Sequence, residues 1–422
     1  MALYNAGRDP ADTFNIVFNR LITGNRYLKL VKDPVHGEVI IEDEDLPILD
    51  SPGLQRLRRI KQIGLGDLVY PGANHTRFEH ALGTMYIARE VGTRMGLDLD
   101  SLRTIRISAL LHDVGHGPFS HTSEKFSMAS SGIDHSYLTE KEIRGGRTSD
   151  ILASMDIDPE EVSRVASGKC DGLGRLLHSQ VGVDRMDYLM RDAHYTGVAY
   201  GVIDYDRIIG TLIFHGGEIA IREKGSQAAE SLLVARFLMY PAVYLHHVSR
   251  IADAMMLRAL ESLREAGRSV EEIMSMDDVS LTNELLTGGG TGSSMMRRIL
   301  DRNLYKRAIY ISREEVPDMD YLLDISGSRD RIRELEDEVA SEAGLDSGGV
   351  LVDIQSPPEL DEMGIKVLRG NQLEYLRERS PLVMSLRDAQ WNYWRFGVYC
   401  PRENLDRVRK VCEGHGWRQL EE

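Results

Sequence analysis

The chain has 422 residues, 42% of them hydrophobic and 28% charged, with a formal net charge of −15 at pH 7. This composition supports a sizeable core in two or three domains, excludes intrinsic disorder of the whole chain, and disfavours general nucleic-acid binding because an acidic surface repels phosphates. No apolar run approaches the roughly 20 residues that span a bilayer, and Met1–Pro10 lacks a signal-peptide pattern, so we expect a cytoplasmic protein without a membrane partner.

The first part of the chain predicts a short hairpin followed by helices. Residues 28–41 (LKLVKDPVHGEVII) have the pattern of two short strands about a Pro-His-Gly turn. A helix is expected to start around residues 50–52, and the apolar spacing of residues 77–95 and 102–114 predicts two longer helices, the second of them buried. Residues 116–124 (HGPFSHTSE) combine Gly, Pro and Ser and predict a loop.

In the second part of the chain, the type of predicted secondary structure changes near residue 316. Before it, helical spacing covers residues 178–193 and 225–266, and the Gly-rich residues 287–294 predict a loop. After it, helical and extended patterns alternate (330–343, 349–354, 365–370, 394–400 and 403–413). We therefore predict a mainly α protein with a lead-in over residues 1–28, a helical body over 29–315 and a smaller α+β C-terminal domain over 316–422.

The strongest local signal is the adjacent pair His112–Asp113, which ends the buried helix and enters a Gly-rich turn (LLHDVGHG, 110–117). A buried carboxylate is costly there without a partner. A divalent metal would remove that cost, because imidazole and carboxylate are both good ligands of transition metals. A capping Asp beside a structural His is the alternative. The three cysteines form no CxxC pair, so neither a disulfide framework nor a Cys-rich zinc site is expected.

Two further segments place polar side chains on single helix faces. Arg77 and His80 are three residues apart at the start of one helix. A second helix carries a stripe at i, i+3, i+4, i+7 and i+8, formed by Asp184, Asp187, Tyr188, Arg191 and Asp192. An ion-paired surface helix would give the same pattern for Asp187 and Arg191. It fits Asp184 less well, because the neighbours of that residue are apolar.

His80, His112, Asp113 and Asp184 together match an H…HD…D pattern, and the chain resembles the HD-domain metal-dependent phosphohydrolases, in particular their dNTP triphosphohydrolase branch. Five blocks in order carry the resemblance over roughly residues 28–260: KDPVHG (32–37), LQRLRRIKQIG (54–64), YPGANHTRFEHALG (70–83), LLHDVGHGPFSH (110–121) and VDRMDYLMRDAHYTG (183–197). The resemblance implies an HD-domain helical body. It also implies hydrolysis of dNTPs at the α-phosphorus, to a deoxynucleoside plus tripolyphosphate.

The resemblance also implies roles for individual histidines and aspartates. One divalent metal would be held by His80, His112, Asp113 and Asp184, and this ligand set leaves its identity open among Fe, Mn, Mg, Ni and Zn. Catalytic roles are implied for His116, one turn beyond His112, and for His135. The Glu that usually follows the second of these histidines is Ser136 here.

Phosphate binding requires local cations in so acidic a chain. By resemblance, Arg77, Arg185 and Arg236 contact the triphosphate, and Arg185 stands where a family member has lysine, whose ammonium has a different reach. The sugar and the rest of the pocket are implied to contact Gln62, Tyr188, Asp192, Tyr244 and His246. Ordinary core packing is the alternative for the aromatic residues.

Regulated members of the family bind a second nucleotide at subunit interfaces, and part of that site is matched by Lys29, Asp50, Gln55, Arg58 and Arg207. Lys32 departs from the pattern, because an Asn is expected there. A solvated helix face is the alternative for these charges. The resemblance thus implies a homo-oligomer, dimer or tetramer, that binds a nucleotide substrate and a nucleotide activator.

Two other functions stay open. The metal site could serve another nucleotide, such as a monophosphate or a cyclic phosphodiester, or the protein could sense nucleotides with a vestigial site. The sugar-side matches at Tyr188, Asp192 and Tyr244 favour the triphosphohydrolase. Four buried ligands kept without a metal would be costly, which disfavours the vestigial site.

Overall fold

The computed structural model describes residues 28–357 and 364–417, so the predicted lead-in over residues 1–28 lies outside it except for Leu28. The predicted hairpin is confirmed: β1 (Leu28–Asp33) pairs antiparallel with β2 (Gly37–Glu42). Gly37 takes a φ of +80° at the turn, where a side chain would be strained. The short helices α2 (Leu46–Leu49) and α3 (Pro52–Arg56) follow.

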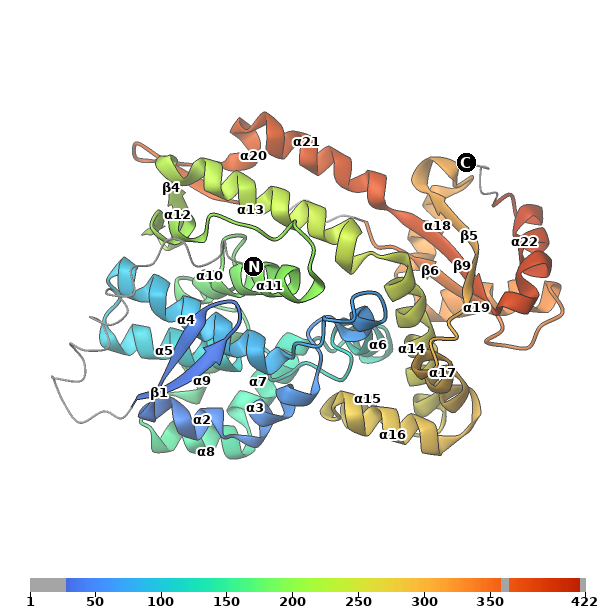
Figure 1. The fold of residues 1–422 in the computed structure, drawn as a ribbon, viewed down its shortest axis with the longest axis horizontal. Helices are drawn as coiled ribbons and strands as arrows, with labels where there is room; N and C mark the ends of the chain where they lie inside the picture. The colour runs from blue at the N-terminus through green and yellow to red at the C-terminus, as the bar shows by residue number, and fades with distance from the viewer. Residues whose placement is uncertain (1–27, 358–363, 418–422) are drawn as a thin grey trace.

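The helical body is built on α4 (Arg77–Met95) and α5 (Leu99–Leu111), which pack against each other (Figure 1). α4 begins at a capping box between Thr76 and Glu79 and ends at Gly96 in the left-handed conformation, so local signals fix both of its ends. The body continues with α6 (His121–Ser131), α7 (His135–Arg144), α8 (Gly146–Ser154), α9 (Pro159–Ala166), α10 (Leu173–His178), α11 (Val183–Thr196) and α12 (Tyr205–Ile209).

Several predicted spans were wrong in detail. A turn at residues 179–182 divides the span 178–193 between α10 and α11. The span 225–266 is divided into α13 (Ser226–Met239), a π-helical turn at Tyr240–Tyr244, and α14 (His247–Glu265). Pro241 lies in that turn and lacks the N–H that a continuous helix requires. The loop expected at 116–124 ends at Ser120, where α6 takes over.

The loop predicted at residues 287–294 was also wrong. α16 (Asp278–Gly288) and α17 (Gly290–Leu300) occupy it, with Gly289 alone between them. Across the described ranges, no single helix has the length and apolarity to cross a membrane. The segments Glu223–Tyr244 and His247–Glu265 meet the length and composition test together, but they are bent by 61°.

Besides the β1–β2 hairpin, the described residues form two small sheets. One sheet has the order β3 (Leu212–His215), β4 (Glu218–Arg222), β7 (Lys366–Arg369) and β8 (Gln372–Tyr375), and the other has the order β5 (Lys306–Ser312), β9 (Arg395–Cys400) and β6 (Leu351–Ile354). The remaining helices are α15 (Val270–Ser275) in the body, and α18 (Met319–Ser326), α19 (Arg329–Glu342), α20 (Leu376–Arg379), α21 (Pro381–Ala389) and α22 (Leu405–Gly414) in the C-terminal part. The mainly α class with a smaller α+β part is confirmed.

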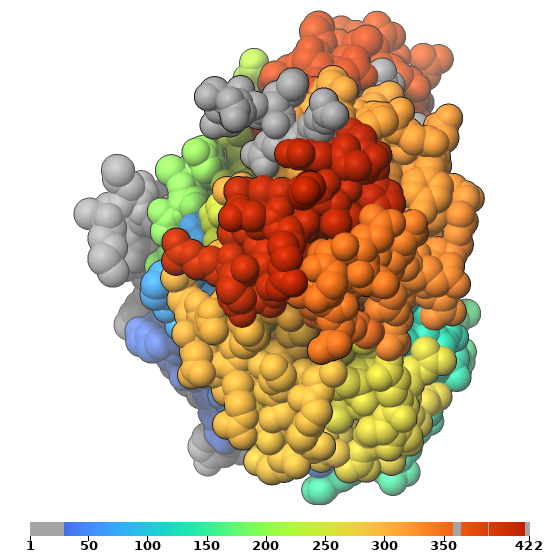
Figure 2. All heavy atoms as spheres, turned by 90° about the vertical axis from the view of Figure 1, so that its right-hand side faces the viewer, coloured from blue at the N-terminus to red at the C-terminus, as the bar shows by residue number. Residues whose placement is uncertain are grey.

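The boundary at residue 316 stays a prediction. β5 precedes it but pairs with β9, and β7 follows it but pairs with β4 of the body. The buried apolar residues form three clusters, in the helical body, around α14 to α17, and on the three-stranded sheet. Figure 2 shows the C-terminal elements, orange to red, lying on the yellow helices of the middle cluster. α14 contacts both α6 of the body and β6 of this sheet.

Candidate metal centre and active-site cavity

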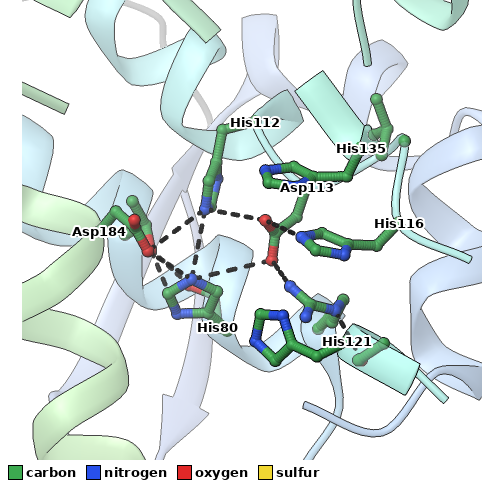
Figure 3. A network of polar contacts seen from close by, with 12 residues as sticks. His80, His112, Asp113, His116, His121, His135 and Asp184 are labelled. Carbon is green, nitrogen blue, oxygen red and sulfur yellow. Dashed lines mark hydrogen bonds and ion pairs between the residues drawn. The ribbon is translucent and has the colours of Figure 1, made fainter. Parts of the chain in front are cut away.

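The four predicted metal ligands converge from three helices (Figure 3). His80 lies in the first turn of α4, His112 and Asp113 directly follow α5, and Asp184 lies in the first turn of α11. The Nε2 atoms of His80 and His112 are 3.3 Å apart. Asp184 Oδ1 is 3.1 Å from His80 Nε2, and Asp113 Oδ1 is 3.3 Å from His112 Nε2. The ligand atoms of His80, His112 and Asp184 all lie within 4.8 Å of one another, a spacing at which they can surround one ion, and Asp113 adjoins this group beside His112.

The other ring nitrogen of each histidine is already engaged. His112 Nδ1 donates to the carbonyl of Ala109 at 2.7 Å, and His80 Nδ1 donates to Asp187 Oδ2 at 2.7 Å. In the neutral form of each ring, Nε2 therefore presents a lone pair, and it faces carboxylate oxygens that are also acceptors. A point surrounded only by acceptors requires a cation, and two imidazoles with two carboxylates suit a divalent metal.

The electrostatics agree with that demand for positive charge. Burial lowers the pKa of His80, but the hydrogen bonds to Asp184 and Asp187 outweigh it and raise this pKa to about 10. Burial opposes ionisation of Asp184, yet His112 and His80 hold its pKa well below the usual range. The site fits a divalent metal by its donor set, and hydrogen bonds from outside this set orient His80, His112 and Asp113.

An ion-pair network around the buried Asp187 and Arg191 lies behind this centre, and the sequence did not predict it. Asp187 accepts from His80, from His36 in the hairpin turn at 2.5 Å, and from Arg191 Nε at 2.8 Å. Arg191 also donates to Asp33 Oδ2 at 2.8 Å. The surface ion pair considered for Asp187 and Arg191 is wrong, because both side chains are 0% exposed. An i,i+4 spacing alone cannot distinguish a buried pair from a solvated one.

His116 and His135 lie side by side next to the metal ligands. Their rings stack with centroids 4.1 Å apart, and His116 Nε2 is 3.4 Å from Asp113 Oδ1. Burial, with Arg77 nearby, holds the pKa of His116 well below its ordinary value. Burial also opposes the charge on His135, but its contact with Glu124 raises its pKa. The sequence analysis did not predict a role for Glu124. The only local pattern that points to this residue is its i,i+3 spacing from His121.

A cavity of about 690 Å³ adjoins the metal centre, within the range of small-molecule sites. Seven of the eight predicted substrate residues line it: Gln62, Arg77, Arg185, Tyr188, Asp192, Arg236 and Tyr244. His246 is not part of this lining. Its ring lies edge-on to Tyr70 and stacks on His247.

Hydrogen bonds orient the lining residues. Arg77 donates to Asp113 Oδ2 at 2.6 Å and to Ser120 Oγ at 2.8 Å. Arg236 and Arg185 both donate to Gln180 Oε1, which draws the two guanidinium groups together. On the other side, Tyr244 donates to Asp192 Oδ2 at 2.7 Å. The other oxygen of that carboxylate is 2.8 Å from Nε2 of the buried His75, which the sequence also did not predict.

The five residues of the predicted regulatory site lie at the surface. Gln55 donates to the carbonyl of Leu49 and accepts from Arg58 Nε at 2.9 Å, and the Arg58 guanidinium covers the Phe78 ring. Arg207 donates to the carbonyl of Lys224. Lys29 and Asp50 are exposed. Gln55 and Arg58 are thus brought together, and the regulatory role of all five stays a prediction.

Comparison with known proteins identifies two family regions: residues 77–192 match the HD domain, and residues 203–415 match the HD associated region. An uncharacterized protein of Methanocaldococcus jannaschii is 36% identical over 91% of this chain and 81% of its own length. The Dictyostelium discoideum homolog of the deoxynucleoside triphosphate triphosphohydrolase SAMHD1 is 26% identical over 76% of this chain, which spans 65% of that relative.

A solved structure agrees with these sequence matches. A phosphohydrolase of Bacteroides thetaiotaomicron superposes with a TM-score of 0.70 at 25% identity, covering 89% of this chain and all of that one. Of the four predicted metal ligands, His80 and Asp184 lie near the two ends of the matched HD domain, and His112 and Asp113 lie between them. The chain therefore belongs to the HD-domain phosphohydrolases, with an HD domain followed by an HD associated region.

Proposed function

We propose that the protein hydrolyses deoxynucleoside triphosphates to deoxynucleoside and tripolyphosphate, with one divalent metal held by His80, His112, Asp113 and Asp184. The observation that carries the proposal is the convergence of these four acceptors on a cavity that also holds three arginines. The SAMHD1 relatives, which are named for this reaction, support the choice of substrate.

A divalent ion at this point would act as a Lewis acid on a phosphate oxygen and as an activator of water. Arg77, Arg185 and Arg236 would bind the triphosphate chain and stabilise the charge that develops on the leaving group. Between the two stacked histidines, the direction of the pKa shifts favours His135 as the proton donor and His116 as a neutral hydrogen-bonding partner.

The deoxyribose preference would come from the wall opposite the arginines. The bond from Tyr244 to Asp192 closes that wall beside Tyr188, and the Tyr188 and Tyr244 rings lie edge-to-face with centroids 6.4 Å apart. Asp192 would accept a hydrogen bond from a 3′-hydroxyl, and the Tyr244 ring, held by its bond to Asp192, would exclude a 2′-hydroxyl. A role of Gln62 at the sugar and a role of His246 in the pocket belong to the same proposal.

Further parts of the proposal rest on the resemblance alone. These are a homo-oligomer, dimer or tetramer, and activation by a nucleotide bound near Lys29, Asp50, Gln55, Arg58 and Arg207. The choice among Fe, Mn, Mg, Ni and Zn, and the cytoplasmic location, also stay predictions.

Product analysis tests the reaction. Each dNTP is incubated with the protein and Mn²⁺ or Mg²⁺, alone and with GTP or dGTP as activator. We expect tripolyphosphate and deoxynucleoside, lost by at least a hundredfold in His112→Ala and Asp184→Ala, because removing a ligand removes the bound ion. His194→Ala, exposed on α11, is the matched control and should keep full activity.

Other products would change the assignment. Orthophosphate or pyrophosphate in place of tripolyphosphate, or turnover of monophosphates only, would replace the triphosphohydrolase with another HD phosphohydrolase activity. Absence of any product, together with absence of bound metal by elemental analysis, would favour the nucleotide-sensing alternative.

A further inference from the structure

The cavity has a second wall, which the proposed mechanism does not use. It is formed by α6, by α14 and by the residues that follow β6, and its lining includes Lys125, Asp253 and Gln355. These elements pack together, because α14 contacts α6 on one side and β6 on the other. Both α14 and β6 belong to the HD associated region, so the cavity is shared between the two family regions.

The charged groups around this wall are held in fixed positions. Arg250 forms two bonds with Asp353, from Nε at 2.8 Å and from Nη2 at 2.5 Å, and Tyr399 donates to the same carboxylate. The guanidinium of Arg250 is thus already neutralised. Asp253 Oδ1 accepts from Thr122 Oγ1 at 2.6 Å, and Gln355 Oε1 accepts from the backbone N–H of Arg395 at 3.2 Å.

Each of three side chains is left with a free hydrogen-bonding group. Among the described residues, Asp253 Oδ2 and the Gln355 amide nitrogen make no hydrogen bond, and Lys125 Nζ makes no hydrogen bond or ion pair. Lys125 is exposed to solvent and lines the cavity, and its ammonium lies within electrostatic reach of Arg250 and Asp253. The wall therefore offers one anionic acceptor and two donors.

This set differs from the arginine end of the cavity and does not suit a polyphosphate, because the carboxylate would repel it. It does suit the edge of a nucleobase, which is flat and carries hydrogen-bond donors beside acceptors. Guanine presents N2–H₂, with N1–H next to it, as donors, and O6 and N7 as acceptors. Adenine has no hydrogen on N1, so a carboxylate opposite that atom is repelled.

We propose that Lys125, Asp253 and Gln355 form a nucleobase subsite that prefers guanine, with Asp253 accepting from N1–H and N2–H₂ and with Lys125 and Gln355 donating to O6 and N7. The subsite rests on the proposed function, since it reads the base of the same nucleotide. Asp253 and Gln355 would give the HD associated region a direct part in substrate choice.

The test compares kcat/KM for dGTP, dATP and dITP, whose base lacks the 2-amino group. The native protein should prefer dGTP over both by about tenfold. Asp253→Asn keeps an oxygen for Thr122 but removes the anionic acceptor. It should erase the preference for dGTP over dITP while changing dATP turnover by less than about threefold. Gln355→Leu should weaken dGTP turnover in the same way. Asp301→Asn and Gln372→Ala, both exposed, are the matched controls.

Two outcomes separate the subsite from the reaction. Equal kcat/KM for dGTP and dATP, unchanged in Asp253→Asn, would overturn the subsite and leave the triphosphohydrolase standing. If no dNTP is hydrolysed, the reaction fails, and the subsite is then tested by the binding of α,β-imido-dGTP and α,β-imido-dATP. Tighter binding of the guanine analogue, lost in Asp253→Asn, supports the subsite, and equal Kd values overturn it.

Discussion

His80 and His112 are aligned by bonds on the ring side that faces away from the metal. His112 uses a backbone carbonyl, which is part of α5, whereas His80 depends on the Asp187 side chain. Such outer partners fix the tautomer and the ring orientation, and their removal typically costs a factor of about 10–100 in metal affinity. Asp187 is therefore expected to act as a positioning residue for His80. Its effect on metal affinity can be separated from its effect on stability through the ion pair with Arg191.

Asp187→Asn should lower the affinity for Mn²⁺ by about tenfold or more, because an amide no longer holds the His80 tautomer. The matched control is Asp33→Asn, which weakens the ion pair between Asp33 and Arg191. Asp33 does not contact His80. Both variants should unfold at lower temperature, since each leaves Arg191 underpaired. Metal titration distinguishes them, and an equal loss of affinity in both would show that general destabilisation, not positioning, is the cause.

The turn between α5 and α6 is the element that places His116 and orients Arg77. Phe119 and Ser120 both have positive φ, 56° and 52°, which is strained for residues with side chains. Asp278 on α16 holds this turn, accepting from Phe119 N–H at 2.7 Å and from Lys61 N–H at 3.0 Å. A helix from the HD associated region thus holds the turn of the HD domain that carries His116.

Burial raises the pKa of Asp278 to about 6, although its two backbone hydrogen bonds act in the opposite direction. The folded protein therefore binds this proton more tightly than the unfolded chain. The stability that this proton contributes is present below about pH 4 and is lost as the pH rises to about 6. Asp278→Asn should remove this pH dependence of stability. The Tm of the variant minus the Tm of the native protein should therefore rise between pH 4 and pH 7.

Calorimetry at several pH values measures that difference. Asp100→Asn, exposed on α5, should follow the native pH profile. A Tm difference between Asp278→Asn and the native protein that stays constant with pH would contradict the raised pKa of Asp278. The substitution would then act only by removing a hydrogen-bond acceptor.

At the scale of the whole molecule, the metal centre ties together α4, the end of α5 and α11, which share one core. A ligand that binds only the folded state stabilises it by mass action, by about 2.7 kcal/mol at a hundredfold excess over Kd. Chelator treatment should therefore lower the Tm, and Mn²⁺ should restore it. His112→Ala should melt at the same temperature with and without Mn²⁺, while His194→Ala should respond like the native protein. A metal-dependent shift that survives in His112→Ala would place the stabilising ion elsewhere.

The sequence determined the features that depend on local chemistry. The Thr76–Glu79 capping box and Gly96 bound α4, apolar spacing with the H…HD…D pattern predicted four residues that come together at one end of the cavity, and the family resemblance predicted seven more that line it. These signals act over a few residues, or repeat a pattern that a metal requires, so they can be read without knowledge of the packing.

Only the tertiary structure decided which polar residues are buried and which glycine of residues 287–294 is required by close packing. Asp187 and Arg191 have the spacing of a surface pair, but contacts with His36 and Asp33 from a distant hairpin enclose them. Among the glycines predicted to form a loop, Gly292 allows close helix packing, since a Cβ there would lie 2.4 Å from Ser262 Oγ of α14. Burial and close approach depend on segments far apart in the chain, so no local pattern encodes them.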